Sequence, residues 1–299
     1  MSRGLPRFPD FKPLALEDRQ VIQPLLWDYQ PDTSELTFTN LFIWKDHYHF
    51  VWCLDGDCLL VAGAGPSGAW GYPPVGPGPR ADAARRLLTW LREEKGEPAP
   101  RLERADARLA AELSGQAGLT VEPVRDHFDY VYLTADLIHL AGNKYHAKRN
   151  HLNSFRQAHA FSYVPMGAAH LPACLALTES WCRLKRCEED LSLMGEWAAV
   201  RLALRHVEDL ALTGGVVLVD GRVEAFALGE LLNRDTAVVH IEKANPEIRG
   251  LYALINQQFC EQAWSAAPFI NREQDLGEPC APPNSPTTPT AWLKNSASG

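Results

Sequence analysis

The stretch His240-Ile241-Glu242-Lys243-Ala244-Asn245-Pro246-Glu247-Ile248-Arg249-Gly250-Leu251-Tyr252 places an apolar strand directly before an amphipathic helix. The first N–H groups of a helix have no partner within it, and the helix dipole favours negative charge there. Backbone groups at this helix start can therefore hold a phosphate or carboxylate, and Gly250 would permit a close approach. Arg249 and Tyr252 flank that position. The residues of this stretch expected to bind substrate or donor are His240, Lys243, Asn245, Arg249, Gly250 and Tyr252. The stretch predicts a ligand site at a strand-to-helix junction, which suits acyl or aminoacyl transfer.

The segments on either side predict two halves with a similar order of elements. Apolar spacing and alternation indicate helices and strands, and Asp55-Gly56-Asp57 and Asp220-Gly221 are hairpin turns. In the first half we expect helices at 14–27, 81–94 and 105–113, and strands at 38–44, 48–54, 58–64, 119–123 and 129–133. In the second half we expect helices at 171–185, 196–212 and 251–264, and strands at 214–219, 223–232, 237–242 and 269–271.

Helix, antiparallel strands, central strand, helix, strand is the order of a GNAT (acyl-CoA N-acyltransferase-type) domain. We therefore predict an α/β (α+β) protein with two tandem GNAT-like domains, whose mixed, mostly antiparallel sheets are flanked by helices. The first domain would cover residues 1–135. The second would cover 136–279 and begin with a basic helix.

The composition of the 299 residues is that of an ordinary globular protein, with 46% hydrophobic and 22% charged residues. The formal net charge of -8 gives no overall basic field, so contact with a nucleic acid would need a local basic patch. The seven cysteines contain no Cys-x-x-Cys pair, and His47 and His49 lack a third metal ligand. No stretch has the length of a membrane span. We expect reduced thiols, no metal, no tightly bound cofactor and a cytoplasmic location.

A local basic patch does occur at 142–156, where cationic residues alternate with aromatic ones. Residues four apart share a face of a helix, and lysine and arginine neutralise phosphate while tyrosine can stack on a base. The segment predicts a helix that binds phosphates of a tRNA, a coenzyme or a lipid headgroup. The alternative is a solvated basic helix that bridges two domains. The residues expected to bind are Lys144, Tyr145, Lys148, Arg149 and Asn153.

Polar residues also occur along the end of the strand that precedes Asn245. Because side chains alternate along a strand, His240 and Glu242 should face one side and Lys243 the other. Glu242 is a candidate general base that would deprotonate an attacking amine or hydroxyl. The alternative is a strand-end ion pair that fixes the helix start.

A second polar segment, Asn271-Arg272-Glu273-Gln274-Asp275, follows the last predicted strand. Glu273, a second catalytic candidate, and Asp275 would bind a cationic side chain or an α-amine. Arg272 would pair with a carboxylate or phosphate, and Glu230 would lie beside this segment. The alternative is a polar turn whose charges neutralise one another.

Four stretches together resemble the soluble phosphatidylglycerol lysyltransferase C-terminal-like family, over roughly Phe8 to Pro279. The resemblance implies tandem GNAT folds related to aminoacyl-tRNA-dependent transferases. In membrane-bound relatives such a module moves lysine from its tRNA onto phosphatidylglycerol, but the N-terminal membrane domain of those relatives is absent here. The stretches are Asn40-Leu41-Phe42-Ile43-Trp44, Lys144–Asn153, His240-Ile241-Glu242-Lys243-Ala244 and Ile270–Gly277.

The tail 280–299 loses all periodicity and becomes rich in proline, threonine and serine. The resemblance implies a basic terminal strand instead, and a shifted reading frame after Pro279 can yield a sequence similar to that ending. We hypothesise a frameshift near Pro279. As written, the tail is expected to be disordered, which would leave a sheet edge exposed.

The resulting expectation is an acyltransferase of the aminoacyltransferase type. Its donor would be an aminoacyl-tRNA or an acyl-CoA, and its acceptor an anionic lipid or a small-molecule amine. The alternative is a non-catalytic module that binds phosphate, tRNA or a phospholipid headgroup. The sequence leaves donor, acceptor and oligomeric state open.

Overall fold

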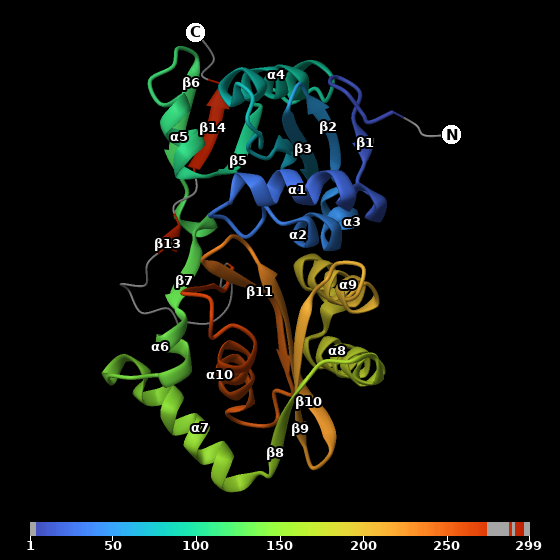
Figure 1. Cartoon of the computed structure of the whole chain (residues 1–299). Coiled ribbons are helices and arrows are strands. Elements are labelled where there is room, and N and C mark those ends of the chain that lie inside the picture. Colours follow the sequence, from blue (N-terminus) through green and yellow to red (C-terminus); the bar gives the residue numbers. More distant parts are fainter. Residues whose placement is uncertain (1–3, 274–286, 289–290, 296–299) are drawn as a thin grey trace. The chain divides into compact units, whose positions relative to one another are not determined.

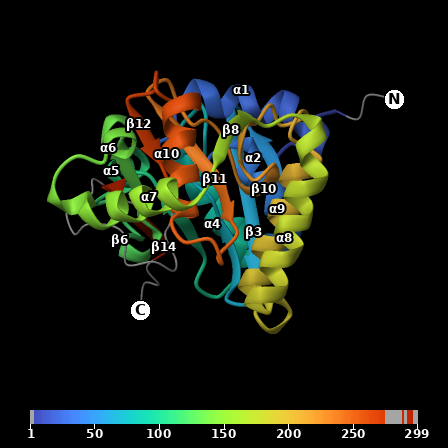
Figure 2. The same ribbon diagram turned by 90° about the horizontal axis from the view of Figure 1, so that it is seen from below.

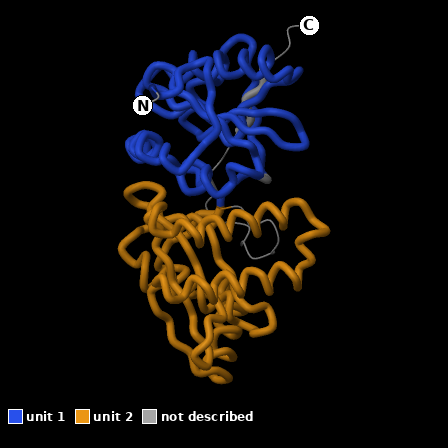
Figure 3. The backbone as a smooth tube through the Cα atoms, turned by 90° about the vertical axis from the view of Figure 1, so that its right-hand side faces the viewer, with its two compact units in different colours: residues 1–129, 287–299 blue, residues 130–286 orange. Residues whose placement is uncertain are grey.

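The computed structural model describes residues 4–273, 287–288 and 291–295, which are arranged in two compact units (Figure 1). Unit 1 comprises Met1–Asp129 with Thr287–Gly299, and unit 2 comprises Tyr130–Pro286 (Figure 3). The division lies before the predicted boundary at 135/136, which falls inside α6 (Thr134–His139). The reason is that β7 (Asp129–Leu133) pairs with β12 (Phe269–Asn271) in the sheet of unit 2.

Unit 1 is a mixed sheet in the order β1-β2-β3-β4-β5-β14-β6. Strands β2, β3 and β4 are antiparallel neighbours, and β4 runs parallel to β5. Helix α4 packs its apolar side on this sheet through Ala83, Leu87 and Leu91. The strands are β1 (Lys12–Pro13), β2 (Val51–Asp55), β3 (Cys58–Gly65), β4 (Gly68–Gly71), β5 (Arg101–Ala105), β6 (Leu119–Pro123) and β14 (Ala291–Asn295); the helices are α1 (Arg19–Tyr29), α2 (Phe38–Ile43), α3 (Lys45–Tyr48), α4 (Arg80–Glu93) and α5 (Ala107–Leu113), with the 3₁₀ helices η1 (Leu16–Asp18) and η2 (Arg125–His127).

Unit 2 is a sheet in which β7, β12, β11, β10, β9 and β8 are successive neighbours. Helices α6, α7 and α10 cover one face of the sheet, and α8 and α9 cover the other (Figures 1 and 2). Its further strands are β8 (Phe161–Pro165), β9 (Thr213–Val219), β10 (Arg222–Leu231) and β11 (Thr236–Ala244); its further helices are α7 (His146–Ala158), α8 (Leu171–Lys185), α9 (Leu191–Arg205) and α10 (Leu251–Ala263), with the 3₁₀ helices η3 (Asn143–Tyr145), η4 (Ala168–His170) and η5 (Cys187–Glu189); the two-residue strand β13 (Thr287–Thr288) follows in the chain.

The main architectural prediction is confirmed, because both units consist of a mixed sheet flanked by helices. Both predicted hairpins are present. The turn Asp220-Gly221 has φ angles of 49° and 77°, the conformation that two-residue hairpins require. Several helices and strands also begin or end within a residue or two of their predicted positions.

Two predictions about strands are wrong. The segment 38–44, expected to be a strand, forms helix α2, whose start is capped by the Thr37 hydroxyl accepting from Asn40 N at 3.0 Å. All six residues of α2 are buried, so the aromatic run fills a core as a helix. Residues 291–295 of the tail form β14 between β5 and β6, so no edge is left there, contrary to the prediction. Residues 280–286, 289–290 and 296–299 lie outside the described part.

Candidate functional site

The candidate site of unit 2 lies where two parallel strands separate. Strands β11 and β12 pair over Thr236–Val238 and Phe269–Asn271 and diverge beyond these residues. Beside the divergence, Leu228 pairs with Ile241 while Gly229 pairs with Val239, so His240 is the extra residue of a β-bulge. Bulges redirect side chains and are frequent next to ligand sites.

The bulge directs His240 between two carboxylates. Its Nδ1 lies 2.7 Å from Glu273 Oε1 and its Nε2 lies 3.0 Å from Glu230 Oε1. The His240 side chain is only 1% exposed. Burial alone would lower the pKa of His240, but the hydrogen bonds to Glu230 and Glu273 outweigh it and raise the pKa to about 9. The imidazole is therefore a cation at neutral pH, held by two anions.

A second polar group forms around Glu242. Arg272 Nη2 donates to Glu242 Oε1 at 3.2 Å, and Asn256 Nδ2 of α10 donates to Glu242 Oε2 at 2.9 Å. Asn256 is not among the residues predicted from the sequence. Its position could have indicated a buried polar contact, since it is a polar residue among Leu254, Ile255 and Phe259 on the buried side of α10.

Lys243 points away from Glu242, as predicted, toward the face covered by α8 and α9. Its Nζ lies 2.5 Å from Glu196 Oε1 and 3.4 Å from the centroid of the Trp181 ring. Burial lowers the pKa of Lys243, and the charge of Glu196 opposes this shift. Nothing in the sequence spacing links Glu196 or Trp181 to this lysine. Lys243 therefore belongs to a separate cluster with Glu196 and Trp181. Because its side chain is only 5% exposed, its predicted role in donor binding has no geometric support.

The predicted alternation failed at His240. His240 and Glu242 were expected to act side by side, but they engage different partners because the bulge inserts one residue. The two groups are instead connected through the two residues that directly follow β12. Arg272 pairs with Glu242, and Glu273 pairs with His240. Glu230 does lie beside this segment, as expected.

The basic helix is real, but part of it is structural. Lys144 pairs with Asp136 at 2.8 Å, and Arg149 Nη1 donates to the carbonyl oxygens of Leu140 and, at 2.6 Å, Gly142. Tyr145 is buried in the core, because it ends the 3₁₀ helix η3 instead of lying on α7, so it cannot stack on a base. Exposed or half-buried polar groups on the outer side of α7 remain at Lys148, His151, Asn153 and Arg156.

Gly250 brings this helix against the start of α10. Its φ is +89°, and a Cβ atom added there would lie 2.6 Å from the His151 carbonyl oxygen. Arg249 Nε lies 3.2 Å from His151 Nδ1. The start of α10 and helix α7 are therefore in contact. The close approach that glycine permits is to the backbone of α7, however, and not to a phosphate.

Replacing Gly250 with alanine is expected to destabilise unit 2 by about 2 kcal/mol, since a left-handed conformation and an overlap with rigid backbone both oppose the added methyl group. Urea denaturation measures the loss. Gly221→Ala is the matched control, because Gly221 also has a positive φ but nothing within 4 Å of the added Cβ. Equal losses in the two variants would show that the contact with α7 is unimportant.

The remaining predicted residues have mainly structural contacts. Asn245 accepts from Glu247 N at 3.0 Å and donates to Glu224 Oε2 at 2.9 Å, which stabilises the turn after β11. Asn271 is buried and accepts from Glu273 N at 2.7 Å. Tyr252 is partly exposed on the first turn of α10. Asp275 lies outside the described residues.

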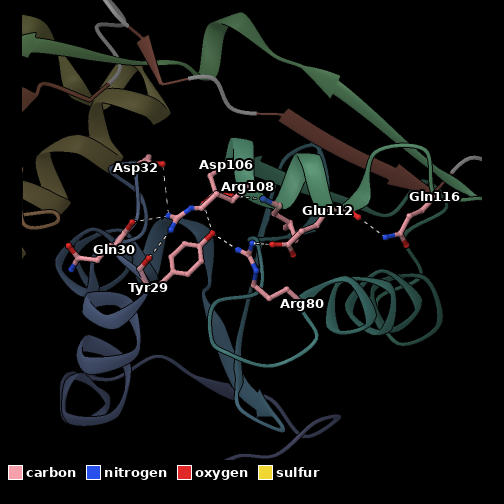
Figure 4. Close-up of polar contacts among 9 residues, drawn as sticks. Tyr29, Gln30, Asp32, Arg80, Asp106, Arg108, Glu112 and Gln116 are labelled. Carbon is pink, nitrogen blue, oxygen red and sulfur yellow. Dashed lines mark hydrogen bonds and ion pairs between the residues drawn. The ribbon is translucent and has the colours of Figure 1, made fainter.

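Unit 1 uses the corresponding helix start differently. Arg80, the first residue of α4, is buried and pairs with Glu112 of α5, and it also donates to the Tyr29 hydroxyl (Figure 4). Tyr29 donates in turn to the fully buried Asp106. The cation at the start of α4 is therefore already paired with an internal carboxylate, that of Glu112.

The described residues contain neither a metal-binding cluster nor a membrane-spanning helix. Over 4–273 and the two short C-terminal strands, no group of three or more His, Cys, Asp or Glu side chains has the arrangement of a metal site. In the same part of the chain, no helix combines the length and apolar character needed to cross a bilayer.

The fold defines a protein with two GNAT-like units in tandem. Residues 28–280 match the family described as phosphatidylglycerol lysyltransferase, C-terminal, and the chain belongs to this family. The family is related to aminoacyl-transferases, and the resemblance seen in the sequence is confirmed. No curated protein sequence matches the chain.

Three solved structures illustrate the similarity. A conserved protein of unknown function from Bacteroides thetaiotaomicron VPI-5482 has 29% identity and a TM-score of 0.84, covering 95% of this chain and 98% of that chain. The C-terminal domain (DUF2156) of a putative lysylphosphatidylglycerol synthetase from Agrobacterium fabrum has 12% identity and a TM-score of 0.62, covering 94% and 92%. L-PGS from Bacillus licheniformis has 10% identity and a TM-score of 0.54, covering 80% and 81%. The last two comparisons show the fold alone.

Proposed function

We propose that this protein is an acyl- or aminoacyl-transferase whose reaction centre lies at the divergence of β11 and β12. The observation that carries the proposal is the pair of side-chain links across the divergence, His240 to Glu273 and Glu242 to Arg272. The pairing of β11 with β12 ends at Val238 and Asn271. The side chains linked beyond this point are ionisable and not apolar. Membership of a family related to aminoacyl-transferases supports the same reading.

The charges of this centre favour a substrate that carries an amine. The carboxylates of Glu230, Glu242 and Glu273 face the cations His240 and Arg272, so these five groups leave one negative charge in excess. A cationic amine would compensate this charge. In the proposed reaction a cationic amine first loses one proton to solvent. The neutral amine, or a hydroxyl, then attacks the activated carbonyl and passes its proton to Glu242 or Glu273. The C–O or C–S bond to the donor breaks, and the same carboxyl group returns the proton to the departing oxygen or sulfur, so that an alcohol or thiol leaves.

The donor would be held by the corner where α7 meets α10. Arg249 and Arg156 are exposed there, His151 and Lys148 are half-buried, and the N-terminus of α10 adds a positive dipole end. Lys144 and Arg149 contribute less than the sequence predicted, since each already binds an internal acceptor. An aminoacyl-tRNA or an acyl-CoA would present phosphate to this corner.

The test combines binding and transfer on the full chain. Thermal shift with lysyl-tRNA, acetyl-CoA and phosphatidylglycerol vesicles identifies the ligand class, since a ligand that binds only the folded state raises Tm. With the stabilising donor, we expect Glu242→Gln to lower transfer by about 10²-fold or more while the thermal shift stays unchanged. Glu247→Gln, in an exposed residue just beyond β11, is the matched control and should keep full transfer.

A non-catalytic binding module is the second candidate. The observation in its favour is that both oxygens of Glu242 already accept hydrogen bonds, from Arg272 and Asn256. In that case a ligand would still raise Tm, no transfer would be seen with any donor, and Glu242→Gln would change neither measurement. Unchanged transfer in Glu242→Gln and Glu273→Gln would reject both residues as the base.

A further inference from the structure

Helix α8 ends in a way that brings two cysteines together. Arg186, the residue after the helix, has a left-handed φ of 52°, and its N–H donates to the carbonyl oxygens of Arg183 and Cys182. In this type of helix termination the chain reverses, and the residue after the left-handed one contacts the last turn of the helix. Here these two positions are Cys187 and Cys182.

The two side chains influence each other. The Cys182 side chain contributes to the raised pKa of Cys187, and neither cysteine is in a disulfide. Cys187, in the 3₁₀ helix η5 between α8 and α9, is fully buried, whereas Cys182 is partly exposed. A reagent in solvent can therefore reach the Cys182 thiol, whereas the Cys187 thiol is shielded from solvent.

We propose that Cys182 and Cys187 are a redox pair that closes a reversible disulfide when the protein meets a hydroperoxide. This site is independent of the proposed transfer activity. Bridged cysteines have Cβ atoms about 3.8 Å apart. The chain reversal at Arg186 turns Cys187 back toward the last turns of α8, which contain Cys182. Only the turn at Arg186 separates Cys187 from the last turns of α8, so closing the disulfide does not require a long loop to become ordered.

The chemistry assigns different roles to the two sulfurs. The Cys182 thiolate attacks one oxygen of hydrogen peroxide, so an S–O bond forms, the O–O bond breaks, and the leaving hydroxide takes up a proton to become water. The Cys187 sulfur then attacks the sulfenic sulfur, the S–S bond forms, and a second water leaves with the Cys187 proton. Two thiols and one peroxide give one disulfide and two waters.

The surroundings of Cys187 fit its role as the second thiol. Burial, with the hydrogen bond from Cys182, raises the pKa of Cys187 to about 12, so it stays protonated until the sulfenic acid has formed. The Lys243 ammonium opposes this shift and favours the thiolate as it develops. Oxidation would therefore act on the buried cluster of Lys243, Glu196 and Trp181, on the face of β11 opposite to Glu242.

Other thiols provide comparisons within the same chain. Cys53 and Cys58 are neighbours in the β2–β3 hairpin, and Cys174 lies in α8 itself, but all three are buried. Proximity without access should not be sufficient, so peroxide should reach the Cys182–Cys187 pair first.

The experiment oxidises the full chain with stoichiometric hydrogen peroxide and maps the products by mass spectrometry. Trypsin cleaves after Arg183, Lys185 and Arg186, so a bridge would hold together two peptides that otherwise separate. We expect this linked pair as the first product, with the loss of two of the seven thiols and full recovery in dithiothreitol. One equivalent of phenylarsine oxide, which binds two adjacent thiols, should protect the pair.

Variants separate this outcome from general oxidation. Cys182→Ser should lose the link and the fast thiol loss, while Cys174→Ser should keep both. Because Cys187 is buried, Cys187→Ser is used only if its circular dichroism matches that of the parent. A linked pair elsewhere, fast oxidation that persists in Cys182→Ser, or oxidation of Cys182 to a sulfinic acid without the bridge would overturn the proposal.

Discussion

Asp106→Ala is expected to lower the free energy of unfolding of unit 1 by about 3–5 kcal/mol, the usual loss when one partner of a buried charged group is removed. Asp106 is 0% exposed and accepts from the Tyr29 hydroxyl, from Leu109 N at 2.9 Å and from Arg108 Nε at 3.2 Å (Figure 4). Burial, with the nearby negative charge of Asp106, raises the pKa of the Tyr29 hydroxyl. Alanine would leave Tyr29 and Arg108 without this shared carboxylate acceptor.

The network also joins three helix ends, which is why one residue matters so much. Arg108 donates to the carbonyl oxygens of Tyr29 and Gln30 at 2.9 and 2.8 Å, at the end of α1. Arg80 begins α4 and pairs with Glu112 of α5, and Asp106 caps the start of α5. Loss of the Asp106 carboxylate should therefore destabilise the end of α1 and the starts of α4 and α5 together.

Urea denaturation followed by circular dichroism measures the effect, with Asp190→Ala as the matched control. Asp190 also caps a helix, accepting from Ser192 N at 2.8 Å, but it is exposed, and the hydrogen bonds to its carboxylate come from Ser192 and Leu193 instead of an arginine. The control should lose about 1 kcal/mol, the value of a helix cap alone. If both variants lose the same amount, the buried network adds nothing beyond the cap.

Local chemistry allowed much of the fold to be predicted. The Asp220-Gly221 turn needs two positive φ angles, which aspartate and glycine tolerate, so the β9–β10 hairpin follows directly. Helix α8 follows from its apolar spacing. By contrast, the aromatic run of α2 has a high intrinsic preference for a strand, and only burial of all its residues, together with the Thr37 cap, makes it helical.

The candidate site was predictable in its residues but not in its pairings. The polar residues near the end of β11 and directly after β12 drew attention to Glu242, Arg272 and Glu273, because charged residues at the ends of apolar strands are unusual. The bulge at His240 depends on register with β10, which no local pattern in β11 reveals. The same limit applies to Glu196, which reaches Lys243 from a helix 47 positions away in the chain.

The stability of unit 2 is expected to fall as pH rises through 9, and His240 is the cause. The pKa of His240 is about 9 in the folded protein and about 6.5 in an unfolded chain. A raised folded pKa means that the folded state binds the proton more tightly. The contribution is therefore complete below about pH 6.5, declines above it and is lost as pH passes 9. The difference in pKa corresponds to about 3 kcal/mol.

Two measurements test this expectation. Imidazole NMR signals followed from pH 6 to 10 should show one histidine that titrates near 9, and that signal should be absent in His240→Gln. In urea denaturation, His240→Gln should be about 3 kcal/mol less stable than the parent at pH 6, and the gap should close toward pH 10. Glutamine keeps a hydrogen-bond donor but no charge, so the closing gap reports the charge.

His206→Gln is the matched control for the charge of a histidine beside a carboxylate. His206 Nδ1 lies 2.8 Å from Asp209 Oδ2, but its side chain is 29% exposed and its partner is more exposed still. Solvent screens such a pair, so the control should show a stability difference below about 1 kcal/mol. A His240→Gln variant that behaves like this control would mean that Glu230 and Glu273 do not hold a charged imidazole, and the charge balance proposed for the transfer site would fail with it.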